Sequence, residues 1–400
     1  MTHTRQHPKG GPQAPATAAT GEERELMTGE TTTAARRSRC VVLEEFGRPP
    51  AVRDLTVDRP PPGGLVVEVR FGGVCGTDAH LQQGKLPIST PVVLGHEGLG
   101  VVAELGGEPV TDATGAPLRP GDTVMWASSI SCGTCVPCRI HGEPTLCENR
   151  TTYGVTIPAG TGPGPAGSWS QYMCLRPGTT VVRLSGGIDP PAAMAFACAG
   201  PTMVHALRRR PVRLGETVVV QGSGPVGLAA AALAQLSGAA QVIVVGGPKE
   251  RLDLAARAGI GDHHLDAVGA DGPGPALARA LELTGGRGAD LVVECSGAPE
   301  AVGQGLRLTR RGGAYLIVGQ YTDRGDTEVN PHQFVHRQLT VAGSWGFTGA
   351  HLAAYVDHLP VLAGRFDLPG LVTSFPLDAA GQALAHVADG SVMKAVLRPS

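Results

Sequence analysis

Four of the nine cysteines fall within a short stretch of the chain, at Cys132, Cys135, Cys138 and Cys147. Three of them occur at every third position, so they cannot pair in separate disulfides, whereas four thiolates can converge on one tetrahedral ion. Zinc is the usual occupant of a four-sulfur site, and because all its positions are filled such an ion is structural. A redox cluster and an iron–sulfur site are the alternatives.

A second set of metal donors is spread more widely. Cys75 lies in GGVCGTDAH, His96 lies in LGHEGLG, and Cys198 begins an apolar, helix-like run. Three protein donors and one vacant position describe a catalytic zinc, whose fourth place is held by water or substrate oxygen. Each residue alone is a weak signal, since an isolated cysteine is more often a small buried hydrophobe.

A glycine-rich motif indicates nucleotide binding. A buried strand over 217–221 leads into Gly222-x-Gly224-x-x-Gly227, then into an alanine-rich helix and a second strand. Gly222 permits a tight turn, Gly224 lets the backbone approach a pyrophosphate, and Gly227 allows close helix–strand packing. The N-terminus of the helix then offers free N–H groups to the phosphates.

Further strands are expected over 289–297 and 313–320, alternating with helical stretches. Alternation of this kind predicts an α/β fold with a doubly wound parallel sheet.

Composition and charge exclude several other functions. With 33 basic against 35 acidic residues and no single-sign block, the 400-residue chain shows no feature of nucleic-acid or membrane-surface binding. The longest apolar segment, 226–236, is too short to span a bilayer. Residues 1–39 lack apolar periodicity and a secretory signal, so we expect a disordered extension on a cytoplasmic protein, with Met27 as a second candidate translation start.

These motifs together resemble a zinc-dependent medium-chain alcohol dehydrogenase, from about Cys40 to Ser400. The resemblance is carried by GVCGTDAH, GHEGLGVVAELG, RPGDTV, the four-cysteine lobe, CAGPTMVHAL and GSGPVG. It implies a Rossmann sheet inserted in a β-rich, GroES-like catalytic domain. The implied domains are a catalytic domain over 40–198 and 344–400, which carries the structural zinc lobe 132–147, and a Rossmann nucleotide-binding domain over 199–343.

The resemblance also implies a role for each donor. Cys75, His96 and Cys198 match the catalytic zinc ligands, and Glu97 matches an acid behind the metal that can become a transient ligand. Asp78 matches a carboxylate that orients the His96 ring, although it can also be a turn residue. The four-cysteine lobe departs from the family in its last gap, which is one residue longer than usual, and an inserted loop residue accommodates this.

The proton of the alcohol needs a route out of the cleft. Thr77 lies two residues after Cys75, so its hydroxyl can accept that proton, and His80 can deliver it to water. Both can instead be ordinary turn and surface residues.

Several residues match the cofactor site of the family, and the choice between NAD and NADP stays open. Gly246 stands where an acid normally binds the adenosine ribose. Its absence removes repulsion against a 2′-phosphate, for which Lys249 or Arg251 could supply charge, yet Arg251 also matches a basic residue of NAD users. The other matching residues are Thr202, Pro225, Val226, Val318, Gly319 and Gln320.

The predicted function is reversible hydride transfer between an alcohol, secondary or bulky, and NAD(P)+, in a homo-oligomer (dimer or tetramer) with two zinc ions per chain. The alternatives are a polyol or sugar dehydrogenase and a non-catalytic nucleotide- and zinc-binding regulatory protein. Trp126, Ser128, Leu86 and Trp169 are expected to line the substrate cleft or to pack elsewhere. The Gly/Pro-rich insert 155–167 is expected to be a flexible loop near the cleft or a surface excursion.

Overall fold

The computed structural model describes residues 36–107 and 109–399. Most of the predicted disordered extension, residues 1–39, lies outside the described residues. None of the helices in the described part is long and apolar enough to cross a membrane.

The last four residues of that predicted extension belong instead to strand β1 (Arg36–Leu43), which pairs antiparallel with β2 (Ala51–Val57). The segment RRSR reads as polar because Arg37 and Arg39 are exposed, while Arg36 is half-buried over the Tyr172 ring. Ser38 between them is fully buried, and its hydroxyl bonds both the carbonyl and the N–H of Tyr172. The predicted boundary at residue 39 is therefore too late.

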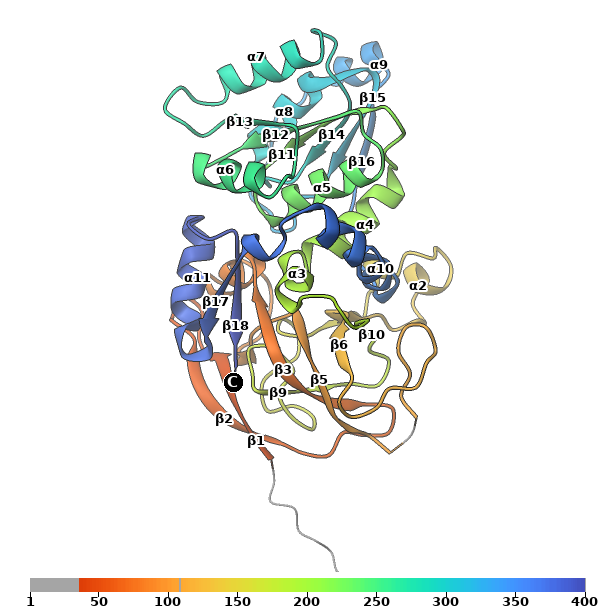
Figure 1. Cartoon of the computed structure of the whole chain (residues 1–400), viewed down its shortest axis with the longest axis vertical. Coiled ribbons are helices and arrows are strands. Elements are labelled where there is room, and N and C mark those ends of the chain that lie inside the picture. Colours follow the sequence, from red (N-terminus) through yellow and green to blue (C-terminus); the bar gives the residue numbers. More distant parts are fainter. Residues whose placement is uncertain (1–35, 108, 400) are drawn as a thin grey trace, which may run out of the picture. The chain divides into compact units, whose positions relative to one another are not determined.

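Two sheets build the part of the chain that carries the metal donors (Figure 1). One has three strands in the order β2-β1-β4, and the other has seven, in the order β10-β6-β5-β3-β18-β17 with β9 also paired to β3. The remaining strands are β3 (Leu65–Val74), β4 (Val92–Val93), β5 (Gly98–Leu105), β6 (Thr123–Trp126), β9 (Tyr172–Leu175), β10 (Val181–Arg183), β17 (Val372–Pro376) and β18 (Lys394–Arg398).

Two glycines let the large sheet close tightly beside the donors. A Cβ on Gly98, at the start of β5, would overlap the indole of Trp126. A Cβ on Gly73, near the end of β3, would lie 2.9 Å from the carboxyl carbon of Glu97. Because both glycines lie where Cys75 and His96 leave the sheet, this packing fixes the two donors relative to each other.

A third sheet has six strands and is parallel throughout, with the order β13-β12-β11-β14-β15-β16. The predicted doubly wound parallel sheet is therefore confirmed, and the strand predicted over 217–221 has those bounds. Its strands are β11 (Thr217–Gln221), β12 (Gln241–Gly246), β13 (His263–Asp266), β14 (Ala289–Glu294), β15 (Thr309–Ile317) and β16 (Thr340–Gly343).

Alternate residues of the parallel strands pack against helices on opposite faces, as burial on both sides requires. Val218 and Val220 of β11 share a core with α4 (Ala199–Arg209), α5 (Pro225–Leu236), α6 (Lys249–Arg257) and α10 (Gly349–Arg365). Val219 instead shares a core with α7 (Gly274–Leu283), α8 (Pro299–Leu308) and α9 (His332–Arg337).

Short elements complete the fold, and the insert 155–167 packs onto β4. Pro158 bridges to Val92, and a Cβ on Gly167 would meet the Val93 and Leu94 carbonyls. The short elements are α1 (Gly76–Gln82), β7 (Ser129–Ile130), α2 (Val136–Arg139), η1 (Pro144–Leu146), β8 (Thr151–Thr152), α3 (Pro190–Ala195), η2 (Pro369–Leu371), η3 (Leu377–Ala379) and α11 (Ala380–Asp389).

Candidate active site

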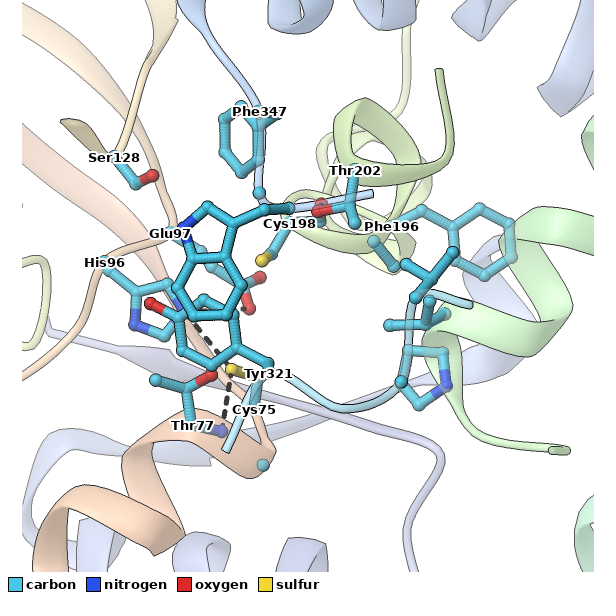
Figure 2. A pocket seen from close by; sticks show the side chains of 18 of the residues that line it. Cys75, Thr77, His96, Glu97, Ser128, Phe196, Cys198, Thr202, Tyr321 and Phe347 are labelled. Carbon is cyan, nitrogen blue, oxygen red and sulfur yellow. Dashed lines mark hydrogen bonds and ion pairs between the residues drawn. The ribbon is translucent and has the colours of Figure 1, made fainter. Parts of the chain in front are cut away.

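Cys75 and His96 meet where two segments leave the sheets (Figure 2). Cys75 caps helix α1, and its sulfur accepts the Thr77 N–H at 3.3 Å and lies 3.2 Å from His96 Nε2. His96 Nδ1 lies 3.3 Å from a carboxylate oxygen of Asp78, which is fully buried and also accepts the Cys75 N–H. Asp78 thus positions both donors and leaves Nε2 of His96 directed at the sulfur.

Cys198, at the N-cap of α4, brings a second thiol to the same point. Its side chain lines the same cavity as Cys75 and His96, but Cys198 is not part of the group of Cys75, His96 and Glu97 whose ligating atoms all lie within 4.8 Å of one another. The hydrogen bond from the Cys198 thiol lowers the pKa of Cys75 well below its usual value, and the same contact, followed by burial, raises the pKa of Cys198. The lowered pKa of Cys75 favours the thiolate, the form in which sulfur binds metals.

Glu97 contributes a buried oxygen with no donor. Its Oε1 atom has no hydrogen-bond partner in the described part of the chain and lies 3.9 Å from His96 Nε2. The ligating atoms of Cys75, His96 and Glu97 all lie within 4.8 Å of one another. Sulfur, imidazole nitrogen and an unpaired carboxylate oxygen converging in this way fit a zinc ion.

The other Glu97 oxygen forms an ion pair with Lys394 on β18. Lys394 is 2% exposed and also donates to the Val74 carbonyl at 3.3 Å. Burial is the largest single effect and lowers the pKa of Lys394, but the charges of Glu97 and Cys75 and the hydrogen bond to Glu97 together outweigh it. The pKa is therefore raised overall, which favours the charged lysine.

The four cysteines of the lobe also converge. The sulfurs of Cys132, Cys135, Cys138 and Cys147 lie within 4.8 Å of one another despite the lengthened last gap, in which η1 forms. The Thr134 hydroxyl and backbone N–H lower the pKa of Cys132 to about 5, while burial raises that of Cys138 to about 12. Four sulfurs in this arrangement fit a closed zinc site.

A cavity of about 230 Å³ opens beside Cys75, His96 and Cys198. Tyr321 and Trp345 form part of its wall as a stacked pair with ring centroids 4.5 Å apart. The other apolar side chains of the wall are Val155, Ala195, Phe196, Ala199, Pro225, Val226, Val318 and Phe347. The space next to the metal donors is therefore bounded mainly by aromatic and aliphatic groups.

Of the four residues considered for the cleft, only Ser128 lines this cavity. Trp126 is buried in a core between strands, and the fully buried Trp169 donates from Nε1 to the Gly73 carbonyl at 2.8 Å. Leu86 packs against the core that contains Trp169. These three side chains therefore belong to the hydrophobic cores and not to the cavity wall.

Thr77 and His80 both line the cavity, as does Thr322 from the loop after β15. His80 Nδ1 lies 2.8 Å from the Thr322 hydroxyl. Burial, and then the charge of Lys85, lower the pKa of His80 below its usual value.

The glycine-rich turn between β11 and α5 has the geometry of a phosphate cradle. Gly222 has φ +112°, and a Cβ there would lie 2.9 Å from the Cys295 carbonyl carbon. A Cβ on Gly227 would collide with the Gly222 carbonyl, whereas Gly224 faces open space apart from Arg251 at 3.9 Å. The start of α5 has no side-chain cap, so its N–H groups remain available to a pyrophosphate.

Most of the other predicted cofactor residues surround the cavity. Thr202, Pro225, Val226, Val318 and Gly319 line it, while Gln320 lines a neighbouring cavity. Arg251 does not face an open site: its Nε donates to the Gly390 carbonyl at 2.8 Å and its Nη2 to that of Val392 at 3.3 Å.

Some residues of the site are not evident from the sequence motifs. Lys394, Tyr321, Thr322 and Trp345 come from segments far from the metal donors. Lys394 does have a signal, since it is a lone charge in the apolar run VMKAVL, and such a residue is rarely buried unless paired.

Comparisons with known proteins agree with this geometry. Residues 61–186 match the family model of the alcohol dehydrogenase GroES-like domain, and residues 225–359 match that of zinc-binding dehydrogenases. The 5-exo-hydroxycamphor dehydrogenase of Pseudomonas putida is 35% identical over 341 residues, which cover 84% of this chain and 92% of that protein. The sorbitol dehydrogenase of Halalkalibacterium halodurans is 35% identical over 283 residues, covering 70% and 75%.

Solved structures are similar over the same length. An alcohol dehydrogenase from Thermotoga maritima superimposes with a TM-score of 0.85 at 32% identity, covering 91% of this chain and all of that one. A zinc-binding dehydrogenase from Sinorhizobium meliloti, solved with NADP, gives a TM-score of 0.76 at 27% identity, covering 91% and 100%. Fold, donor sets and relatives together show that the chain belongs to the zinc-dependent medium-chain alcohol dehydrogenases and is an NAD(P)-dependent enzyme of that family.

Proposed function

We propose that the protein reversibly oxidises a secondary or bulky alcohol to a ketone or aldehyde, with NAD(P)+ as hydride acceptor. The observation that carries this proposal is the cavity, in which Cys75, His96 and Cys198 lie beside an apolar wall that includes Tyr321 and Trp345. The relative from Pseudomonas putida, named for 5-exo-hydroxycamphor, acts on a rigid bicyclic alcohol and supports a bulky substrate.

Each residue of the site has a proposed role. Zinc held by Cys75, His96 and Cys198 would supply a Lewis acid for the alcohol oxygen, next to the hydride acceptor. Asp78 holds the His96 ring in place. Glu97, tied to Lys394 through one oxygen, keeps its other oxygen near the donors as a reserve ligand.

The chain also provides the proton route. The Thr77 hydroxyl accepts the alcohol proton inside the cavity while it releases its own, and His80 takes up the released proton and passes it to water. A histidine with a lowered pKa suits the last step, because the neutral ring must accept a proton and then release it quickly.

The nucleotide is proposed to bind along the carboxyl edge of the parallel sheet. Its pyrophosphate would lie on Gly222, Gly224 and Gly227 at the start of α5. Its nicotinamide would lie near Thr202, where the backbone of residues 318–320 can bind the amide.

Turnover of an alcohol panel tests the proposal. Purified protein is assayed with NAD+ and NADP+ against a cyclic secondary alcohol, a linear secondary alcohol, a primary alcohol, sorbitol and L-threonine, by absorbance of the reduced nicotinamide. We expect kcat/KM to be highest for the cyclic secondary alcohol. Preference for sorbitol would indicate a polyol dehydrogenase, and absence of turnover by zinc-loaded protein would contradict the proposal.

A variant of the cavity wall connects that result to the structure. Trp345→Ala opens the wall, and we expect it to raise KM for the cyclic alcohol about tenfold while changing that for ethanol little, since one lost aromatic contact is worth roughly 1–2 kcal/mol. Trp345→Phe keeps an aromatic face and serves as the control.

Assembly and location are also proposed. We infer a homo-oligomer, supported by the exposed Val341 on the edge strand β16 and the exposed Val335 on α9, and light scattering would measure it. A cytoplasmic enzyme without nucleic-acid or membrane partners is supported by nine cysteines that form no disulfide and by a net charge of −2. The proposed domains are 199–343 for the nucleotide and 40–198 with 344–400 for catalysis, the latter extended to residue 36 by β1.

A further inference from the structure

Strand β12 ends in two adjacent glycines that leave no room for side chains. A Cβ on Gly246 would lie 2.7 Å from the backbone nitrogen of Ser223 and 2.9 Å from its hydroxyl. A Cβ on Gly247 would overlap Val268 and lie 3.0 Å from a carboxylate oxygen of Asp266. An acid at position 246, which normally binds the adenosine ribose, is therefore excluded by the packing and not simply absent.

The space beside these glycines is taken by residues of two other segments. Ser223 is 2% exposed, and its hydroxyl donates to the Gly247 carbonyl at 2.8 Å and accepts the Gly247 N–H at 2.9 Å. Asp266 ends β13 in register with Gly246. Its carboxylate is exposed and accepts the N–H groups of Val268 and Gly269, which holds the turn at the carboxyl edge.

The two cations that could bind a 2′-phosphate are both engaged. Lys249 Nζ lies 2.7 and 2.8 Å from the two carboxylate oxygens of Asp253. Arg251 is held by the Gly390 and Val392 carbonyls. Glu250, in the first turn of α6, adds a further negative charge to that of Asp266. The edge at the end of β12 is thus acidic, with its positive groups satisfied elsewhere.

We propose that Asp266 makes this enzyme prefer NAD to NADP, by supplying from β13 the negative charge that β12 cannot carry. This inference rests on the proposed dehydrogenase function. The Asp266 carboxylate lies at the adenosine end of the site, where it repels a 2′-phosphate, and the 64% exposed Val268 offers an apolar edge to the adenine. A phosphate of nearly two negative charges placed beside a carboxylate in water is disfavoured about tenfold.

Binding of reduced cofactors tests the proposal without relying on turnover. The zinc-loaded full chain is titrated with NADH and NADPH by fluorescence, and with 5′-ADP and 2′,5′-ADP by calorimetry. We expect NADH to bind at least tenfold more tightly than NADPH. For the same reason, 5′-ADP should bind more tightly than 2′,5′-ADP. Asp266→Asn should tighten NADPH about tenfold and leave NADH within about threefold. Asp266→Ser, whose hydroxyl can still cap the turn, should do the same.

Two further variants complete the design. Glu282→Gln removes an exposed acid of α7 that pairs with Arg279, and we expect it to leave both affinities unchanged. Asp253→Asn releases Lys249 and should tighten NADPH alone.

The outcomes separate the two proposals. Equal affinity of the unmodified protein for NADH and NADPH, or an unchanged ratio in both Asp266 variants, would overturn the role of Asp266 while leaving alcohol oxidation intact. Failure to bind either cofactor, together with no turnover of any alcohol, would overturn the proposed function itself.

Discussion

The imidazole of His80 and the hydroxyl of Thr322 lie 2.8 Å apart, which joins helix α1 to the loop that follows β15. Both residues line the cavity, and Thr322 is 4% exposed. Because Nδ1 of His80 is engaged by Thr322, its Nε2 is the ring atom that can exchange a proton with water. Thr322 is therefore a positioning residue for the proposed proton route.

Thr322→Val removes the hydroxyl that orients His80 while keeping the shape of the side chain. We expect kcat for alcohol oxidation to fall about tenfold below neutral pH, within the range for a misplaced acid–base group. Thr322→Ser retains the hydroxyl and should restore most of the rate. Equal pH–rate profiles for the Val and Ser variants would contradict this role.

His80→Gln tests the proton acceptor itself. Alcohol oxidation needs a neutral His80, and the lowered pKa keeps it neutral to a lower pH than a free histidine. Because hydroxide and buffer bases are scarcer in acid, we expect the largest loss, about 100-fold, at the acidic end of the profile. Added imidazole should restore part of it. The cations near His80 are Lys85 and Arg324. A pH–rate profile of His80→Gln identical to that of the unmodified enzyme would exclude His80 from the proton route.

Lys394→Met leaves the buried Glu97 carboxylate without its counter-ion. Removing one partner of a buried pair costs about 3–5 kcal/mol, so urea denaturation should show that loss. Glu97→Gln in the same chain should recover most of it, since neither charge then remains. Lys85→Met, at an exposed position, is the control and should change the free energy of unfolding little. A single Lys394→Met variant as stable as the parent would mean that Glu97 is not charged.

His351 makes stability depend on pH. Burial, with the nearby charges of His205 and Arg208, lowers its pKa to about 4. The folded state then favours the neutral ring, so this contribution is complete above pH 6.5, the usual value, and is lost as pH falls toward 4. We expect His351→Gln to reduce the fall in Tm between pH 7 and pH 4.5, measured by circular dichroism. If Tm of the variant falls by as much as that of the unmodified protein, groups other than His351 control the pH dependence of stability.

The two zinc sites should be separable by matched substitutions. Cys138→Ser is expected to lower the metal content from two zinc ions per chain to one and to reduce Tm, with turnover retained per folded molecule. Cys198→Ser should also leave one zinc but abolish turnover, because it removes a ligand beside the cavity. Plasma emission spectrometry with activity on the same samples measures both effects. Two zinc ions in each variant would contradict the assignment of these cysteines.

The parallel sheet could be predicted from the sequence because its signals are local. The run TVVVQ before Gly222 is apolar throughout, as a strand buried on both faces must be, and the glycines fix the turn that follows. The start of β1 could not be predicted in this way. Ser38 is buried there by a bond to Tyr172, a residue 134 positions away.

The candidate metal donors could likewise be predicted from the sequence, whereas the residues of the cavity wall could not. Cysteine and histidine are rare enough that their spacing carries information, which holds for the lobe at 132–147. An aromatic side chain serves a core and a cavity equally well, so Trp126 and Trp345 cannot be told apart by type. The sequence also does not show why β12 ends in two glycines. The reason lies in the structure, where Ser223 and Asp266 fill the space that side chains at these positions would need.

Strand β18, between β3 and β17 in the large sheet, delivers Lys394 to Glu97 across 297 positions of sequence. During synthesis the whole nucleotide sheet leaves the ribosome before this strand does. A nascent chain can therefore fold a nucleotide cradle early, but its catalytic centre stays electrostatically incomplete until β18 has been translated.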